Sequence, residues 1–323
     1  MTLPPRGRTR QGSSILVEGG RDSQKADVWS DWLLHRRHAD DPEYAGVIGK
    51  VMERVADRVL DEARLTAGAT LIDVGAGEGL LAFRALARVG PSLRVALTDV
   101  SAPMLRHAEA VAERLGVRGQ CTFHECSAEK LGALADASAD VVVTRAVLAY
   151  VSDKSAALRE FFRVLKPGGR ISLAEPILQD DAFYARALRQ RVEAQASKPT
   201  DLFLPLLHRW KAAQFPDTEE ACAKSPIANY SERDLLHLLR GCGFGEIHLQ
   251  LHIDEMPSLI TSWEVFLGSS PHPLAPTLER ILAEQFSAEE RQFFERIVRP
   301  TVESGRSVTI ERVAYLQARK PPG

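Results

Sequence analysis

Apolar positions along the chain follow two alternating periods, which predicts strands that alternate with helices. Short apolar runs with the length of buried strands occupy residues 70–74, 93–97, 121–124, 140–144 and 170–175. Between them, apolar residues recur at helical spacing over 80–89, 101–115 and 153–165. This alternation is typical of parallel strands that are joined by right-handed helical crossovers.

The last third of the chain has a different pattern. Residues 177–229 contain no strand signal and are interrupted by four prolines, whereas residues 247–253 alternate between apolar and polar side chains as an exposed strand does. A closing strand is expected over 308–318, with helices over 257–305. We therefore predict an α/β fold with a doubly wound, mostly parallel, seven-stranded sheet and helical cap insertions.

These patterns divide the chain into five segments. We expect a flexible tail, N-terminal helices, a sheet core, a first helical insertion, and a final segment that completes the core around a second insertion at about 257–305. The boundaries are 1–25, 26–66, 67–176, 177–229 and 230–323.

Composition and charge narrow the possible functions. The 323 residues include 41 Lys plus Arg and 43 Asp plus Glu, a net charge of −2, which argues against broad nucleic-acid binding. No apolar stretch reaches the roughly 20 residues needed to span a bilayer, and the N-terminus lacks a secretory signal. Four scattered cysteines and the absence of zinc-ligand spacing predict a cytoplasmic protein without a metal.

The segment Asp73-Val-Gly-Ala-Gly-Glu-Gly79 carries the strongest chemical signal. It follows a predicted strand and opens a helix, so its glycines let the backbone turn sharply and let a ligand approach the main-chain N–H groups. The start of the helix favours a carboxylate. Asp73 would repel a pyrophosphate but hold a cationic ligand, so the pattern disfavours a nicotinamide-dependent oxidoreductase.

Asp99 ends the second predicted strand, 22 residues after Gly77. An acidic residue at this place accepts hydrogen bonds from ribose hydroxyls in other nucleotide-binding folds. By itself Asp99 would be interpreted as a helix-preceding cap. Its distance from the glycine segment favours the ribose contact.

Five motifs in register give the chain a resemblance to a known family. They are Asp73–Gly79, Asp99, Ser127-Ala-Glu129, Asp140-Val-Val-Val143 and Leu165-Lys-Pro-Gly-Gly-Arg170. Over residues 45–175 the chain resembles class I S-adenosylmethionine-dependent methyltransferases of the ubiquinone/menaquinone-biosynthesis-like small-molecule group. The resemblance implies a Rossmann-like sheet, S-adenosyl-L-methionine as the methyl donor, a cofactor-binding core over 67–176, and N-terminal helices that cover the cofactor.

The same resemblance assigns cofactor contacts to named positions. These are Asp73, Gly75, Ala76 and Gly77 for the methionine and sugar, Asp99 for the ribose, Val100, Met104, Ser127 and Ala128 for the adenine, and Arg145 and Ala146 where the methionine part meets the acceptor. For Arg145 two interpretations stay open. Its charge pairs with an anion of the acceptor or cofactor, or it forms a surface salt bridge.

The N-terminal run Trp29-Ser-Asp-Trp-Leu-Leu-His-Arg-Arg37 offers further contacts. In related enzymes an N-terminal helix covers the cofactor, so Arg36 or Arg37 would reach the methionine carboxylate. Trp32 would lie over the sulfonium, held there by cation–π attraction. The alternative is an amphipathic helix with solvated arginines.

The acceptor and the catalytic residues are less well specified by the sequence. Methyl transfer needs alignment more than a general base, so we assign no catalytic residue and keep Tyr150, Glu175 and His208 as weak candidates. The acceptor contacts are expected at Trp32, Arg36, Tyr150, Tyr184 and Trp210. Aromatic residues in the insertions suit a small aromatic or hydrophobic metabolite, methylated at oxygen, nitrogen or carbon, for example in natural-product biosynthesis.

The alternative function is a cofactor-binding assembly protein of the same fold without catalysis. The expected partner is a small-molecule acceptor, with neither nucleic acid nor membrane. The sequence is compatible with a homodimer.

Overall fold

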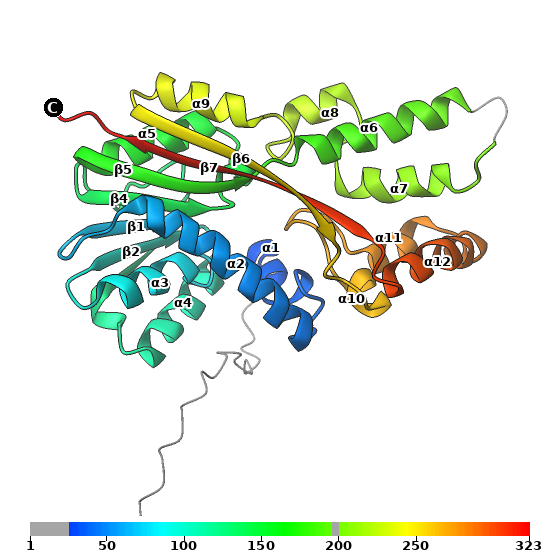
Figure 1. The fold of residues 1–323 in the computed structure, drawn as a ribbon, viewed down its shortest axis with the longest axis horizontal. Coiled ribbons are helices and arrows are strands. Elements are labelled where there is room, and N and C mark those ends of the chain that lie inside the picture. Colours follow the sequence, from blue (N-terminus) through cyan, green and yellow to red (C-terminus); the bar gives the residue numbers. More distant parts are fainter. Residues whose placement is uncertain (1–25, 196–199) are drawn as a thin grey trace, which may run out of the picture.

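The computed structural model describes residues 26–195 and 200–323, and the expected tail at 1–25 lies outside them (Figure 1). One sheet has the strand order β3-β2-β1-β4-β5-β7-β6. Its strands are β1 (Thr70–Val74), β2 (Arg94–Asp99), β3 (Cys121–Glu125), β4 (Ala139–Arg145), β5 (Leu165–Pro176), β6 (Gly245–Pro257) and β7 (Val308–Arg319). The pairs among β1 to β5 are parallel, whereas β7 is antiparallel to both of its neighbours. The predicted fold class is confirmed.

Helices cover both faces of this sheet (Figure 1). They are α2 (Pro42–Ala63), α3 (Leu80–Val89), α4 (Ala102–Arg114), α5 (Lys154–Val164) and α9 (Glu232–Gly241). The apolar sides of α2, α3 and α4 form one buried cluster with the sheet, and those of α5 and α9 form another on the opposite face. Side-chain caps fix the starts of these helices, as at Ser101, whose Oγ accepts from Met104 N at 3.2 Å.

The Lys166–Gly169 run behaves differently from its prediction. The sequence predicts a helix over 153–165 and a strand over 170–175, which leaves this run between them, but β5 already begins at Leu165, which pairs with Ala139. The register then shifts before Val141 pairs with Arg170, and Gly168 has φ of +78°. The run is therefore an irregular entry into the strand, because glycine permits the bulge that keeps both ends paired.

The two helical insertions lie beyond the carboxyl ends of the parallel strands. The first contains α6 (Gln179–Ala194), α7 (Leu204–Gln214) and α8 (Glu219–Lys224), and the second contains α10 (Trp263–Gly268), α11 (Leu278–Gln285) and α12 (Ala288–Glu303). Buried side chains of α7 and of α10 to α12 form a common apolar cluster around Phe294. The two insertions therefore share this core. We call the two insertions together the cap.

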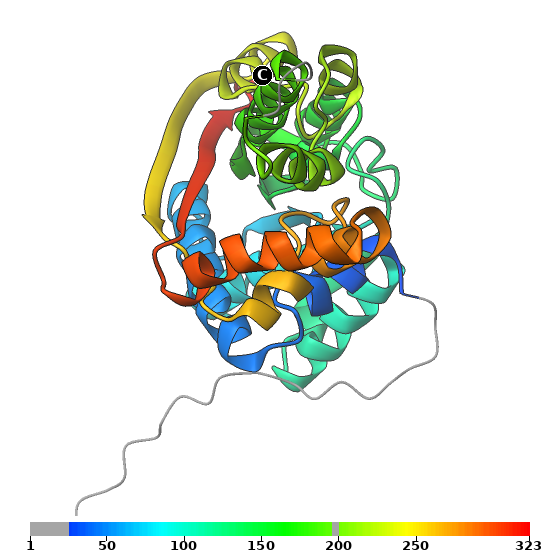
Figure 2. The same ribbon diagram turned by 90° about the vertical axis from the view of Figure 1, so that its right-hand side faces the viewer.

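A two-stranded ribbon carries the second insertion (Figure 2). Pairing between β5 and β7 ends at Pro176 and Val313, whereas β6 and β7 stay paired out to Pro257 and Val308. Residues 253–257 and 308–312 thus extend past the sheet. They place α10 to α12 near the N-terminal helices.

The N-terminal segment begins with a short helix, α1 (Val28–Asp31), followed by a π-helix, η1 (Trp32–Arg36). Asp27 caps α1 by accepting from the backbone N–H groups of Trp29 and Ser30. This cap fixes the start of the first described helix.

Candidate functional site

The glycine loop follows β1 at the point where the strand order reverses between β1 and β4, which is where open α/β sheets bind ligands. Gly75, Gly77 and Gly79 have φ angles of +63°, +54° and +83°. A Cβ atom on Gly75 would overlap the Val147 side chain, and one on Gly77 would lie 3.2 Å from Leu33 Cδ1. The loop therefore needs glycine for its conformation and for the close approach of two other segments.

Two buried carboxylates brace the glycine loop. Asp73 Oδ2 accepts from Ala82 N in the first turn of α3 at 3.0 Å. Asp99 accepts from Gly77 N at 2.8 Å and from Ser101 N at 2.9 Å, one bond to each oxygen. Burial raises the pKa of Asp73 to about 7 and also raises the pKa of Asp99.

The loop after β4 packs against the glycine loop and is held by Glu175. The Glu175 carboxylate is fully buried and accepts from Thr144 Oγ1 at 2.8 Å, Val147 N at 3.0 Å and Ala149 N at 3.2 Å. Ala146 has φ of +56°, an uncommon conformation for a residue with a side chain. Glu175 thus lies where it supports this loop rather than facing open space.

The N-terminal helices cover the glycine loop from the other side. Leu33 contacts Gly77, and Arg37 Nη2 lies 3.3 Å from Glu78 Oε1. The Arg37 side chain is only 13% exposed, and its Nε and Nη1 atoms are buried without a hydrogen-bond partner among the described residues. Burial opposes ionisation of Glu78, but Arg37 and Arg145 outweigh it, and the pKa of Glu78 is lowered.

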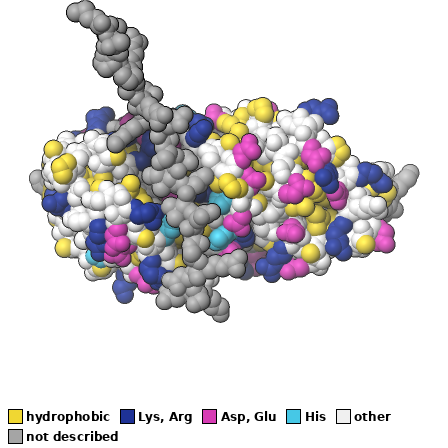
Figure 3. All heavy atoms as spheres, turned by 90° about the horizontal axis from the view of Figure 1, so that it is seen from below, with side chains coloured by type: hydrophobic (Ala, Val, Ile, Leu, Met, Phe, Trp, Pro, Cys, Tyr) yellow, Lys and Arg dark blue, Asp and Glu magenta, His cyan; other side chains and the backbone are white. Residues whose placement is uncertain are grey.

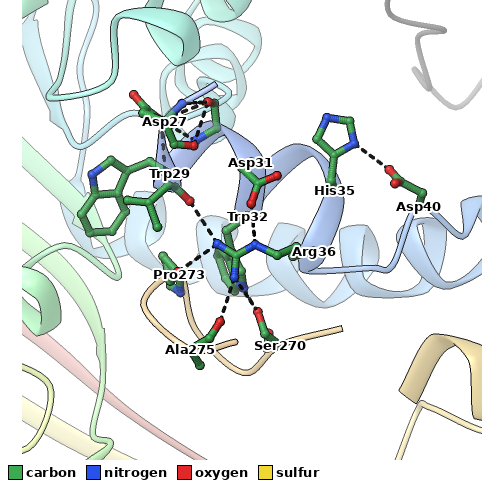
Figure 4. A network of polar contacts seen from close by, with 12 residues as sticks. Asp27, Trp29, Asp31, Trp32, His35, Arg36, Asp40, Ser270, Pro273 and Ala275 are labelled. Atoms are coloured by element: carbon green, nitrogen blue, oxygen red, sulfur yellow. Dashed lines mark hydrogen bonds and ion pairs between the residues drawn. The ribbon is translucent and has the colours of Figure 1, made fainter. Parts of the chain in front are cut away.

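Arg36 is fully occupied by protein partners (Figure 4). Its Nε donates to Asp31 at 2.5 Å, and its Nη1 donates to Ser270 Oγ at 3.2 Å and to Ala275 O at 2.8 Å. Trp32 Nε1 donates to Ser270 O at 3.1 Å. Both side chains therefore tie the N-terminal helices to the segment before α11, and Arg36 has no guanidinium nitrogen left for the ligand contact that the sequence suggested.

Comparisons with known proteins identify the family of the chain. A family model described as a methyltransferase domain matches residues 65–220. The ubiquinone/menaquinone biosynthesis C-methyltransferase UbiE of Klebsiella pneumoniae subsp. pneumoniae is 33% identical over 189 residues, which are 56% of this chain and 74% of that protein. The chain belongs to the class I S-adenosylmethionine-dependent methyltransferases of the ubiquinone-biosynthesis-like group.

Other relatives of this methyltransferase match over shorter stretches. UbiE of Pasteurella multocida is 37% identical over 122 residues, 37% of this chain and 45% of that protein. The chain spans about half the length of several of these curated relatives. Among solved structures, YcgJ of Bacillus subtilis has a TM-score of 0.53 at 18% identity, covering 84% of this chain and 99% of YcgJ, which shows a common fold.

The residues that the sequence assigned to the adenine differ in burial. Val100, next to Asp99, is 48% exposed, whereas Met104 is fully buried and Ala128 nearly so. Ser127 Oγ accepts from Glu129 N at 3.2 Å, so the serine shapes its own turn. Val100 is therefore the most open of the residues that the sequence assigned to the adenine.

The candidate residues in the cap are distributed over separate places. His208 Nε2 lies 2.8 Å from Asp217 Oδ2, and Tyr184 is 47% exposed on α6. Trp210 packs edge-on against Phe266 and Phe294, within the core of the cap. Tyr150 is different, because its ring meets that of Trp29 at 5.4 Å, beside the loops after β4 and β1.

Glu78 is a site residue that the sequence analysis missed. Its pairing with Arg37 joins positions that are 41 residues apart, and no local spacing signals such a contact. In the sequence, Glu78 is only a polar residue between two glycines, without an assigned role. Only the packing of η1 on the loop gives the carboxylate its partner.

Acidic and basic side chains are interspersed on the face drawn in Figure 3, outside the grey atoms.

Within residues 26–195 and 200–323, no group of three or more His, Cys, Asp or Glu side chains is placed to hold a metal ion. No helix of these residues is long and apolar enough to cross a membrane.

Proposed function

We propose that the chain binds S-adenosyl-L-methionine at the glycine loop and transfers its methyl group to a small aromatic or hydrophobic acceptor, at oxygen, nitrogen or carbon. The observation that carries this proposal is the loop itself. Three glycines with positive φ lie between two buried carboxylates, Asp73 and Asp99, at the reversal of strand order. When bound, the donor would supply an electrophilic methyl group, which would pass to a nucleophile of the acceptor as its bond to sulfur breaks and S-adenosylhomocysteine leaves.

The residues present fit this donor. Each Asp99 oxygen accepts one backbone N–H, which leaves further lone pairs for the two ribose hydroxyls. Two buried guanidinium nitrogens of Arg37 have no partner among the described residues, and a buried polar group that is left unpaired costs roughly 1–3 kcal/mol. A methionine carboxylate at the start of α3 would satisfy them, so we assign this contact to Arg37 rather than to Arg36.

The geometry supports catalysis by positioning. Glu175 holds the loop after β4 against the glycine loop, so both walls of the reaction space are fixed before a ligand arrives. Burial, with a smaller contribution from Glu175, raises the pKa of Tyr150, so its hydroxyl stays protonated near neutral pH. Tyr150 is therefore suited to donate a hydrogen bond to the acceptor and poorly suited to act as a general base.

The cytoplasm is the location that the cysteines support. Cys121, Cys126, Cys222 and Cys242 are all free thiols. Free thiols persist in a reducing compartment.

Isothermal titration calorimetry with S-adenosyl-L-methionine tests the proposal. The wild-type chain should bind, and Asp99→Asn should weaken binding by about 1.5–3 kcal/mol, roughly tenfold to a hundredfold. Asp61→Asn is the matched control, because Asp61 is an exposed residue of α2 that pairs with Arg88 of α3. Absence of binding by the wild-type chain, or equal affinity of the Asp99 variant, contradicts the proposal.

Transfer of a tritiated methyl group to small molecules of a native extract separates the two candidate functions. A labelled product supports the enzyme. Binding without any labelled product supports the alternative, a cofactor-binding assembly protein without catalysis.

A further inference from the structure

Arg145 leaves the sheet beside the glycine loop. It is the last residue of β4, and Val147, two residues further on, packs against Gly75. Ala146 between them is held in a left-handed conformation, with its N–H donating to Ala174 O at 2.8 Å. The direction in which the chain leaves β4 is therefore fixed, and such strain is maintained mainly at functional positions.

Among the described residues, the guanidinium of Arg145 has no acidic partner within ion-pair distance. Its one polar contact in the part of the chain that the structure describes is from Nη1 to the Met52 sulfur, at 3.2 Å. By contrast, the partly buried Arg84 and Arg312 each lie 2.7 Å from an aspartate oxygen. A weak sulfur acceptor does not replace the water that the charge loses on burial.

The neighbouring charges make it more costly to bury Arg145 without an acidic partner. Burial lowers the pKa of Arg145, and the like charge of Arg37 adds to the effect. Glu78 and Asp73 act in the opposite direction, but Glu78 pairs directly with Arg37 and Asp73 bonds to Ala82 N. Two guanidinium groups thus share a half-buried region in which one of them has no counter-ion among the described residues.

We propose that Arg145 binds a carboxylate of the acceptor, so that the acceptor is an anionic molecule anchored beside the methyl donor. This inference rests on the proposed function. The proposed function assigns the carboxylate of the donor to Arg37, which follows η1 and pairs with Glu78 in the loop. Arg145 comes from a different segment, the end of β4, two residues before the Val147 that packs on Gly75.

The chemistry of the side chain matches this ligand. A guanidinium presents a planar fork of N–H donors that can hold a carboxylate with two parallel hydrogen bonds. An anchor of this kind fixes the orientation as well as the position of the acceptor. Alignment is what an in-line methyl displacement requires.

Calorimetric titration of the full chain, saturated with S-adenosylhomocysteine, tests the proposal with two probes of similar shape. Benzoate carries the carboxylate, and benzamide is its neutral counterpart. The wild-type chain should prefer benzoate by about tenfold, and Arg145→Met should remove the preference. Arg145→Lys, which keeps the charge but loses the fork, should retain part of it.

Arg94→Met is the control, because Arg94 is exposed at the opposite edge of the sheet, at the start of β2. It should keep the benzoate preference, and all variants should keep their affinity for S-adenosylhomocysteine. If Arg145→Met does not fold, judged by its melting temperature, the comparison of Arg145→Lys with the wild-type chain decides.

Two outcomes overturn the proposal while leaving the proposed function intact. The first is binding of S-adenosylhomocysteine together with either no benzoate preference in the wild-type chain or an unchanged preference in Arg145→Met. The second is an Arg145→Met chain with weakened S-adenosylhomocysteine binding and unchanged binding of 5′-methylthioadenosine, which lacks the amino-acid part. The second result would assign Arg145 to the donor's carboxylate. Absence of S-adenosylhomocysteine binding by the wild-type chain would remove both proposals.

Discussion

The sheet core and the cap build their parts of the molecule in different ways. In the core, the backbone of a few neighbouring residues makes the candidate site, through three glycines with positive φ and two buried carboxylates. In the cap, side chains from distant segments make the structure, since Phe294 of α12 meets Phe203, Trp210 and Phe286. The candidate donor site is thus encoded locally in the sequence, whereas the structure of the cap is encoded by long-range packing.

The sharpest way to test the local part is Gly75→Val. The new side chain would overlap Val147, and a β-branched residue is strained at φ of +63°, so donor binding should be lost completely. Calorimetry with S-adenosyl-L-methionine measures it. Gly119→Val is the control, because Gly119 has open space around it and should bind as the wild-type chain does. Retained binding by the Gly75 variant would place the donor elsewhere.

The long-range part is tested by Phe294→Ala. Phe294 is fully buried at the centre of the cap, so its truncation should lower the free energy of unfolding by about 3–5 kcal/mol. Chemical denaturation measures this change. The affinity of the folded fraction for S-adenosyl-L-methionine should not change, since the glycine loop is untouched. Phe293→Ala, a partly buried neighbour, should be less destabilising. A parallel loss of donor affinity would show that the two regions are not independent.

The boundary between the two regions is tested by two adjacent arginines. Arg37→Met should weaken binding of S-adenosyl-L-methionine by about 1.5–3 kcal/mol, because a charge-assisted contact is lost. Its binding of 5′-methylthioadenosine should not change. Arg36→Met should instead lower the melting temperature, because Arg36 joins η1 to Ser270 and Ala275. If Arg36→Met weakened donor binding and Arg37→Met only lowered the melting temperature, the carboxylate contact would belong to Arg36.

The smallest effect concerns the pH dependence of donor binding. The pKa of Asp73 is raised to about 7 in the folded chain. Between the ordinary aspartate pKa and about pH 7, the folded chain therefore keeps a proton that the unfolded chain has released. The free energy of unfolding falls as the pH rises through this window. A cationic donor favours the carboxylate. Its affinity should therefore increase with pH up to about 7, by at most about tenfold per unit.

Titrations of S-adenosyl-L-methionine between pH 6 and 8 measure this dependence. Asp73→Asn should flatten the profile, and the neutral 5′-methylthioadenosine should show no rise with the wild-type chain. A profile that is equally steep in the variant would assign the proton to another group.

Most of the core could be predicted because its signals are local. Helix α3 begins and ends at the predicted residues, and β1 does as well. The caps at Ser101, Ser231 and Ser287 also follow from short spacings. The early start of β5 was missed, since pairing of Leu165 with Ala139 outweighs the turn signal of the glycines.

The roles of individual side chains were harder to predict, because burial and partners decide them. Arg36 and Arg37 look equivalent in the sequence, yet η1 turns one toward the segment before α11 and the other toward Glu78. Glu175 ends a strand at the candidate site, but its oxygens are taken by the loop after β4. The sharing of one core by both insertions depends on contacts such as that of Trp210 with Phe294.

The bonds from Arg36 and Trp32 to Ser270 and Ala275 have a mechanical consequence (Figure 4). These bonds join the N-terminal helices, which cover the glycine loop, to the segment that follows α10 at the end of the β6–β7 ribbon. Neither part can be displaced alone without breaking them. A displacement of the ribbon would therefore strain the contact of the N-terminal helices with the glycine loop as well.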